Sequence, residues 1–178
     1  HWACWWIQAK DSNIQENSQE KGYSEDYQKV YEKVKNVIPE RQQAFYLQTI
    51  QEWKENYGDV VFIDLLPNKL DEYLLCIYHY KTIYLISPSY PTTLFAPKLM
   101  FQFKGPKHLH IDDVLMKTNN IGNGSVALKS LIQYSKLIGV DTITGYLSDV
   151  DDDHKSRRNH FYEKFGFDVE EKHIKLSL

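Results

Sequence analysis

Cysteine is scarce in this sequence, and long apolar runs are missing. The 178 residues include two cysteines, Cys4 and Cys76, whose separation fits neither a metal site nor a redox motif. We therefore expect a reducing compartment and a cytoplasmic protein. No stretch approaches the roughly 18 apolar residues that a membrane-spanning helix requires. A membrane partner is therefore not expected.

An excess of positive charge is also missing. The chain has 21 Lys and Arg against 24 Asp and Glu, a formal net charge of −3. This balance predicts no basic face for nucleic acid, and it fits a cationic or neutral small partner better than a polyanion. The length and the 42% hydrophobic content indicate a globular chain that buries its core as a single domain, residues 1–178.

The first third of this domain, residues 1–58, is interpreted as a variable N-terminal part. The tryptophan-rich segment 1–9 is expected to be a strand buried in the core, because aromatic side chains mostly occur where they bury area. Two amphipathic helices are predicted over 24–38 and 40–57. The second helix is expected to bury Ala44, Leu47, Ile50 and Tyr57.

The middle part, residues 59–117, reads as a run of strands. It is rich in Val, Ile, Tyr and Phe between Pro, Asn and Gly, a composition typical of strands and turns. The connections leave no room for helices, so we expect the strands to pair antiparallel. The predicted strands are 59–66, 73–80, 82–87, 99–104 and 109–117.

A loop with two glycines links the last of these strands to a helix. Residues 118–124 are polar, and Leu128, Leu131 and Ile132 then recur at helical spacing in a helix that stops at Gly139. The start of such a helix presents unpaired backbone N–H groups and the positive end of the helix dipole. The segment therefore predicts a phosphate-binding site.

Spacing separates three kinds of phosphate loop. A nucleotide-hydrolysing P-loop is excluded, because Ser125 follows Gly124 where that motif requires Lys. The run Gly122-x-Gly124-x-x-Ala127 satisfies the weak dinucleotide fingerprint, which would predict an NAD-dependent oxidoreductase. The run from Asn119 to Gly124 resembles the pyrophosphate loop of the GNAT acetyltransferases, Gln/Arg-x-x-Gly-x-Gly/Ala, except that Asn119 replaces Gln or Arg.

A second motif, about forty residues downstream, favours the GNAT resemblance. The sequence FYEKFGF at 161–167 resembles the signature at the end of the last GNAT helix, and a predicted strand at 142–148 lies between the two motifs. The antiparallel run also argues against a doubly wound dinucleotide fold, whose strands alternate with helices. The resemblance implies an α+β GNAT fold: a central, mostly antiparallel mixed sheet flanked by helices in three α/β/α layers, with residues 118–178 as the acetyl-CoA-binding core.

The resemblance also implies a cofactor site. The backbone at the end of the strand would hold the pantetheine arm of acetyl-CoA, and N–H groups of the loop would hold the diphosphate. Met116 stands where the family has a proline. Arg157, Arg158 and Lys129 either meet the ribose phosphate or are simply exposed. The cofactor-binding candidates are Val114, Leu115, Met116, Asn119, Asn120, Ile121, Gly122, Asn123, Gly124 and Ser125.

The implied reaction is attack of an amine on a thioester, which needs two proton transfers. A lysine-like amine with a pKa of about 10.4 costs roughly 4.6 kcal/mol to deprotonate at pH 7, so we expect a general base. The candidates are Asp112 and Asp113; since adjacent strand residues face opposite ways, only one is expected to face the cleft. The alternative is that neither is a base, with one carboxylate facing solvent and the other pairing across the hairpin. By resemblance, Tyr162 would protonate the leaving thiolate.

The sequence thus predicts an acetyl-CoA-dependent N-acetyltransferase that acts by direct attack in a ternary complex. Its acceptor is the primary amine of an unidentified small molecule or protein, and a homodimer is compatible with the sequence. The alternative is a non-catalytic GNAT-like module that binds CoA or a protein. No metal is expected, because the acidic run that begins at Asp149 has His154 and His160 where a calcium loop requires Gly and Glu.

Overall fold

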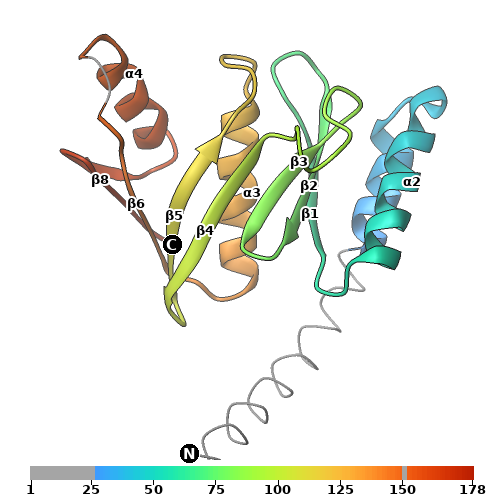
Figure 1. The fold of residues 1–178 in the computed structure, drawn as a ribbon, viewed down its shortest axis with the longest axis horizontal. Coiled ribbons are helices and arrows are strands. Elements are labelled where there is room, and N and C mark those ends of the chain that lie inside the picture. The colour runs from blue at the N-terminus through green and yellow to red at the C-terminus, as the bar shows by residue number, and fades with distance from the viewer. Residues whose placement is uncertain (1–26, 150–151) are drawn as a thin grey trace, which may run out of the picture.

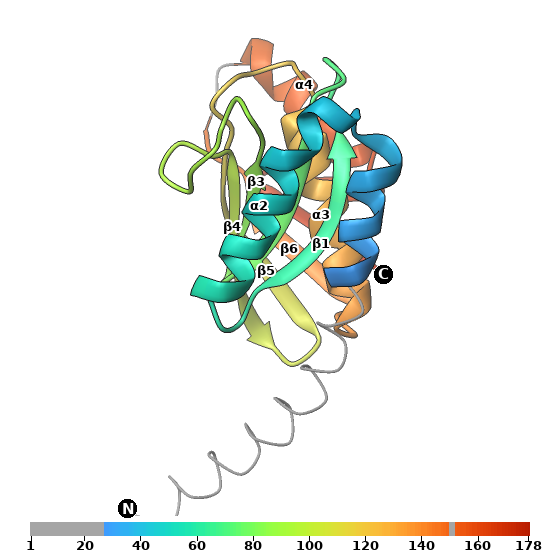
Figure 2. The same cartoon turned by 90° about the vertical axis from the view of Figure 1, so that its right-hand side faces the viewer.

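The structure, a computed structural model, describes residues 27–149 and 152–178 (Figure 1). The predicted buried strand at 1–9 and the residue Cys4 lie outside the described residues, as does the start of the first predicted helix. Across the described residues the chain forms a central sheet with helices on both faces (Figures 1 and 2). The α+β fold class predicted from the sequence is therefore confirmed.

The sheet has eight strands in the order β1-β2-β3-β4-β5-β6-β8-β7. All neighbours pair antiparallel except β5 and β6, which pair in parallel through the crossover helix α3. The sheet is thus mostly antiparallel and mixed, as expected. The strands are β1 Val61–Pro67, β2 Tyr73–His79, β3 Thr82–Ile86, β4 Lys98–Gly105, β5 His108–Leu115, β6 Thr142–Tyr146, β7 Asp168–Glu170 and β8 His173–Ser177.

The helices begin and end where the sequence places its breakers. Residues 27–37 are helical, and α2 (Glu40–Asn56) begins directly after Pro39, whose φ of -54° suits a helix start. Helix α3 (Asn123–Leu137) is followed by Gly139 at φ 80°, a left-handed conformation that commonly ends helices. Helix α4 (Asp152–Glu163) precedes Gly166, which is also left-handed at φ 89°.

Two apolar cores lie on opposite faces of the sheet, because successive side chains of a buried strand point to opposite sides. In β2, Leu74 and Cys76 contact the core beneath α3, whereas Leu75 and Ile77 contact the core beneath α2. Figure 2 looks onto α2 and the helix before it, with the strands behind them. The result is the three-layer α/β/α arrangement that the GNAT resemblance implied.

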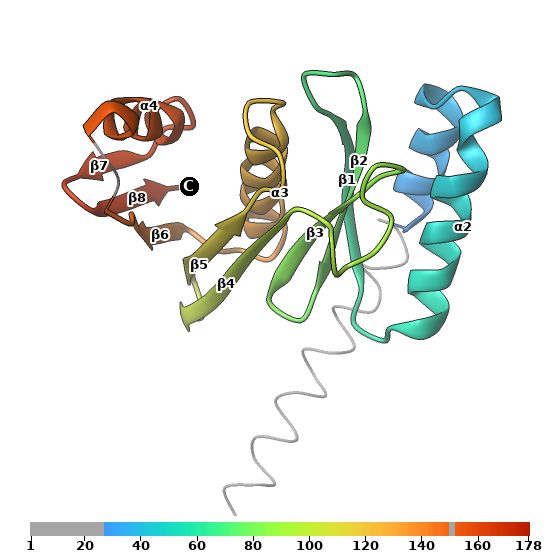
Figure 3. The same ribbon diagram turned by 45° about the horizontal axis from the view of Figure 1, so that its top comes forward.

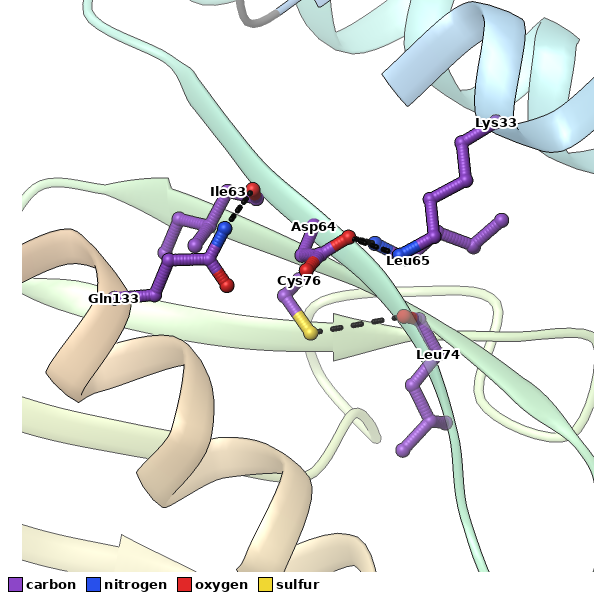
Figure 4. Close-up of polar contacts among 7 residues, drawn as sticks. All are labelled: Lys33, Ile63, Asp64, Leu65, Leu74, Cys76 and Gln133. Carbon is purple, nitrogen blue, oxygen red and sulfur yellow. Dashed lines mark hydrogen bonds and ion pairs between the residues drawn. The ribbon is translucent and has the colours of Figure 1, made fainter. Parts of the chain in front are cut away.

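An ion pair ties the N-terminal helix to the sheet. Lys33 Nζ lies 2.6 Å from Asp64 Oδ1, and the same carboxylate oxygen accepts a hydrogen bond from the backbone N–H of Leu65 (Figure 4). Asp64 sits at a register shift of β1 against β2. The carboxylate thus contacts the helix at an irregular position of the strand.

Several element boundaries and buried positions differ from the sequence predictions. In α2 the buried side chains are Tyr46, Thr49, Ile50 and Trp53. The predicted Ala44 and Tyr57 are exposed, because the face that meets the sheet is rotated toward the larger aromatic residues. Strand β8 was not predicted, and its side chains alternate between buried and exposed from His173 to Ser177.

Strands β5 and β6 separate at one end, and this separation organises the site. Their parallel pairing runs from the pair His108 and Thr142 to the pair Ile111 and Gly145, and then it stops while β5 continues to Leu115. Figure 1 shows the two strands diverging beyond this point. The β6-facing backbone edge of the last residues of β5 is therefore left without a strand partner.

Candidate active site

The N-terminus of α3 forms the base of a cleft. Gly122 caps the helix in the left-handed conformation at φ 87°, and its carbonyl accepts the first helical hydrogen bond, from Val126 N–H, at 3.1 Å. The N–H groups of residues 123–125 therefore have no partner inside the helix. With the positive end of the helix dipole, they form a site suited to an anion.

The hairpin between β1 and β2 holds the glycine loop in place. Lys69 N–H donates to the carbonyl of Ile121 at 2.8 Å. A Cβ atom added at Gly122 would lie 2.9 Å from Lys69 Cγ and 3.1 Å from its backbone nitrogen. Glycine is therefore required here by both the backbone conformation and the close approach of the hairpin. Figure 3 shows this hairpin near the start of α3.

A pair of buried amides joins the same two segments. Asn68 Nδ2 donates to Asn123 Oδ1 at 3.1 Å, and Asn68 Oδ1 accepts from the N–H groups of Leu70 and Glu72. The side-chain nitrogen of Asn123, Nδ2, has no hydrogen-bond partner although the residue is 1% exposed. Asn123 also lines the cleft, so a buried donor lies beside the anion site.

The cleft above the α3 N-terminus has a volume of about 710 Å³. Its lining includes the cationic side chains Lys69, Arg157, Arg158 and Lys164, and no Asp or Glu among the described residues. The cleft is therefore locally positive although the chain is acidic overall. The other lining residues are Val114, Met116, Thr118, Asn119, Asn120, Gly122, Asn123, Gly124, Ser125, His154, His160, Phe161 and Tyr162.

A second, smaller pocket of about 210 Å³ lies where β5 and β6 diverge. Asp112 and Asp113 line it from β5, and Arg158 and Tyr162 line it from α4. Val114, Arg158 and Tyr162 line both cavities, so the two meet at these side chains. We call the larger cavity the cationic cleft and the smaller one the splay pocket. The remaining lining residues of the splay pocket are Ile111, Gly145, Tyr146, Leu147, Ser148 and Ile174.

Tyr162 is held at this junction by neighbouring rings. Its ring lies 5.1 Å from that of Phe161 and 5.7 Å from that of Phe167, both at steep angles. Burial raises the pKa of Tyr162 above its ordinary value of 10.0, and the positive charge of Arg158 offsets part of that rise. The hydroxyl group therefore carries its proton at neutral pH.

The two aspartates are not divided between faces as the sequence predicted. The register of β5 against β4 shifts between Met100 and Phe101, so that Asp112 is the extra residue of a β-bulge. A bulge breaks the alternation of side chains, and both Asp112 and Asp113 are exposed and line the splay pocket. Asp112 Oδ1 accepts from Gln102 Nε2 at 2.6 Å, while Asp113 Oδ1 accepts from the N–H of Val114 at 2.8 Å.

Most of the predicted cofactor-binding residues come together around the cationic cleft. Two do not line it: Leu115, whose side chain is exposed, and Ile121, whose carbonyl accepts the hydrogen bond from the hairpin. Lys129, one of the three basic residues considered from the sequence, is exposed and also lies outside the lining. Arg157 and Arg158 do line it.

Lys69 is a residue of the cleft that the sequence did not indicate. It belongs to the β1–β2 hairpin, about fifty positions before the glycine loop, and nothing in its local sequence points to an anion. Its place depends on the hairpin folding over the loop. Lys164 and Phe161 also line the cleft, and both lie within the FYEKFGF motif, where only Tyr162 was expected to reach the site.

The described residues show no metal site and no membrane span. No group of three or more His, Cys, Asp or Glu side chains within 27–149 and 152–178 is arranged to hold a metal ion. Over the same part of the chain, no helix has both the length and the apolar character needed to cross a bilayer.

No family model and no curated protein matches the sequence. Among solved structures, Ard1 from Thermoplasma volcanium is similar at 12% identity and a TM-score of 0.44, over 86% of this chain and 92% of its own. The PaiA N-acetyltransferase from Thermoplasma acidophilum, in complex with coenzyme A, is similar at 13% identity and a TM-score of 0.44, over 88% of each chain. The anti-CRISPR protein AcrVA5 is similar at 19% identity and a TM-score of 0.41, over 55% of this chain and 100% of its own.

The arrangement of this chain itself agrees with the resemblance read from its motifs. Antiparallel strands β1 to β5 lead into one parallel pair, β5 and β6, joined through α3, and helices cover both faces of the sheet. The fold that the GNAT resemblance implied is the fold observed.

Proposed function

We propose that this protein is an acetyl-CoA-dependent N-acetyltransferase that transfers the acetyl group directly to a primary amine in a ternary complex. The observation that carries the proposal is the junction of two cavities of opposite character. The cationic cleft at the N-terminus of α3 meets the splay pocket, with its two carboxylates, at Val114, Arg158 and Tyr162. The first suits an anionic cofactor, and the second suits an amine.

The cationic cleft provides the groups that the phosphates of acetyl-CoA require. The N–H groups of residues 123–125 would hold the diphosphate, with the ammonium groups of Lys69 and Lys164 adding positive charge. The pantetheine arm would lie along Val114 and Met116, where the backbone edge of β5 has lost its neighbour β6. The thioester would then reach the junction at Tyr162.

The reaction at that junction uses two side-chain roles. Asp112 or Asp113 accepts a proton from the ammonium group of the acceptor, and the freed amine attacks the carbonyl carbon of the thioester. A C–N bond forms, the C–S bond breaks, and its electron pair leaves on sulfur. The hydroxyl of Tyr162 gives its proton to that thiolate. The nitrogen loses its second proton as the amide forms, and that proton restores the hydroxyl of Tyr162, so the products are the N-acetylated amine and CoA, with the first proton left on the aspartate. Such proton transfers each typically contribute about 10²–10⁴ in rate.

Calorimetric titration with acetyl-CoA, CoA and NADH tests the cofactor assignment. We expect saturable binding of acetyl-CoA and CoA and none of NADH, because a dinucleotide ribose requires a carboxylate and none of the described residues that line the cleft carries one. Release of free thiol from acetyl-CoA in the presence of a panel of amines then tests catalysis.

Each result separates two functions. Absence of acetyl-CoA binding in a folded sample would remove the acetyltransferase proposal altogether. Binding of acetyl-CoA without thiol release for any amine in the panel would identify the non-catalytic CoA-binding module instead. Binding of NADH would favour the dinucleotide interpretation of the glycine loop.

A further inference from the structure

We propose that the acceptor is a free α-amino acid, whose carboxylate binds Arg158 while its amino group lies at the aspartates of the splay pocket. The inference rests on the proposed acetyltransferase function and names the class of its acceptor. It follows from three features of the pocket: its size, the state of the Arg158 guanidinium, and the presence of both charge signs.

The splay pocket is small. Its volume of about 210 Å³ is below the range of roughly 300–1,000 Å³ typical of sites for drug-sized ligands. A short molecule fits such a volume. The acceptor must also place its amine within reach of the thioester, at Tyr162 and Val114 where the pocket meets the cationic cleft.

Arg158 is anchored by neutral groups and retains donors for a ligand. Its guanidinium donates to the carbonyl of Ser148 and, through Nε and Nη2, to Asn159 Oδ1 at 3.3 and 3.2 Å. A guanidinium has five N–H donors, so these contacts leave two of them unused. The nearby carboxylate of Asp149 is paired with Lys172 at 2.7 Å. Among the described side chains, no carboxylate lies within ion-pair distance of Arg158.

A guanidinium held in this way is suited to a carboxylate ligand. Arg binds carboxylates through two parallel N–H···O bonds, and the planar group is rigid once anchored. The contacts to Ser148 and Asn159 fix its position on α4 without neutralising its charge. The carboxylate of Asp149 is close enough for the charge of Arg158 to help lower its pKa, but it forms no ion pair with Arg158. An incoming carboxylate would form that direct contact.

The opposite side of the pocket carries negative charge. Asp112 and Asp113 line it from β5, and each has one oxygen engaged by a protein donor, Gln102 Nε2 or the N–H of Val114. The second oxygen of each carboxylate is available to an ammonium group. A cavity of this size with carboxylates on one strand and a guanidinium on the facing helix is complementary to a small zwitterion.

This complementarity distinguishes α-amino acids from the other amine classes. A polyamine has no carboxylate for Arg158, and two or more of its ammonium groups would meet a guanidinium. The N-terminus of a protein has its α-carboxyl group in a peptide bond, which carries no charge. A free amino acid alone places an amine and a carboxylate two bonds apart on one short molecule.

Matched acceptor pairs test the proposal. Glycine, alanine, leucine and glutamate are each compared with the corresponding α-carboxamide, which keeps the amine and loses the carboxylate. We expect at least one acid to be acetylated with a kcat/KM about 10- to 100-fold above that of its amide, as a charged hydrogen-bonded contact is typically worth. Equal use of acids and amides, or acetylation of polyamines alone, would overturn the proposal.

Substitution of Arg158 provides the second test. Arg158→Gln is expected to lower kcat/KM for the preferred acid at least 10-fold more than it lowers kcat/KM for the amide, mainly through KM. Arg158→Lys should restore part of the discrimination. Arg41→Gln, on the exposed surface of α2 and outside both cavities, is the matched control and should change neither value.

Calorimetry keeps the outcomes separate. The preferred acid should bind the complex of wild-type protein with CoA and should bind the Arg158→Gln complex at least 10-fold more weakly. If acetyl-CoA itself fails to bind wild-type protein, the proposed function has failed. If acetyl-CoA binds and the acids neither bind nor react, only the assignment of the acceptor has failed.

Discussion

Among single residues, Tyr162 has the most specific role in the proposed chemistry, because it is the only hydroxyl-bearing side chain of the described residues that lines both cavities. Its aromatic ring is also a packing residue, in contact with Phe161 and Phe167. Replacing it with phenylalanine separates the two roles, since the ring remains and the hydroxyl is lost.

Tyr162→Phe is therefore expected to lower kcat by about 10²–10⁴-fold, the usual contribution of a positioned acid. The affinity for acetyl-CoA and the melting temperature should change little, since the ring contacts are preserved. Steady-state kinetics, calorimetry and thermal unfolding of the variant measure the three quantities. A wild-type kcat in this variant would assign Tyr162 to packing alone.

Arg158 also affects how kcat depends on pH, through the pKa of Tyr162. Burial raises the pKa of Tyr162, and Arg158 lowers it, so the tyrosine is the protonated acid at neutral pH and loses its proton only above its ordinary range. Loss of that proton removes the acid, so kcat should fall on the alkaline side. In Arg158→Gln this alkaline limb should move to higher pH, because one of the two opposing effects is gone.

At the scale of elements, the glycine loop and the β1–β2 hairpin depend on each other. Gly122→Ala forces a non-glycine residue into the left-handed region and brings its Cβ to 2.9 Å from Lys69 Cγ. We expect a loss of stability of about 1–3 kcal/mol and weaker binding of acetyl-CoA, measured by denaturant unfolding and calorimetry. The cause is displacement of the hairpin, since the added methyl group faces Lys69.

Two other glycines serve as comparisons. Gly105→Ala places its Cβ in open space at a negative φ and should change neither stability nor binding by much. At Gly124 the added Cβ would lie 3.5 Å from Phe161, an ordinary contact, so Gly124→Ala should fold normally. A wild-type stability for Gly122→Ala would show that the hairpin is not fixed against the loop.

The sequence could predict the elements whose signals are local, and it failed where the position of a side chain depends on strand pairing. The strand, loop and helix around Gly122 were predicted because their signals are local: apolar spacing, polar loop residues and glycines in order. The division of Asp112 and Asp113 between two faces was wrong, because the bulge that places both on the splay pocket arises from the register of β5 against β4. Register depends on how the strand pairs with its neighbour across the hairpin, and alternation alone assumes a regular strand.

The lining of the cavities also depends on contacts that the local sequence does not indicate. Lys69 lies in the cationic cleft because a hairpin distant in sequence contacts the loop, and no local pattern reports such a contact. The Asn68 to Asn123 hydrogen bond, across 55 positions, is of the same kind. Tyr162, which the motif indicated, does line the cleft, whereas Phe161 of the same motif was expected only to pack and lines it as well.

For the whole molecule, net charge was a poor guide to the cavities. A chain of formal charge −3 favours a cationic or neutral partner by its total, yet the larger cavity is lined by four cations and no carboxylate of the described residues. Local charge follows from how the hairpin, loop and α4 converge, whereas the total describes solubility and long-range attraction. The acidic residues lie elsewhere, two of them in the splay pocket.

The buried layers also make the whole molecule sensitive to alkali. Burial raises the pKa of Cys76 from 9.0 to about 12 and that of Tyr46 from 10.0 to about 12. Cys76 lies in the core beneath α3, with its thiol near the carbonyl of Leu74 (Figure 4), and Tyr46 donates its hydroxyl proton to the carbonyl of Tyr73 at 2.8 Å on the other face. Each group keeps its proton in the folded protein after the unfolded chain has lost it.

The sign of the pH effect follows from this difference. Above pH 9.0 the unfolded chain binds fewer protons than the folded protein, so the free energy of unfolding falls as pH rises toward about 12. One such group contributes a slope of up to about 1.4 kcal/mol per pH unit. Denaturant unfolding at a series of pH values should show this loss, with a shallower slope between pH 9 and 10 in Cys76→Ala. An equal slope in that variant would mean that the thiol ionises as readily in the folded protein as in the unfolded chain.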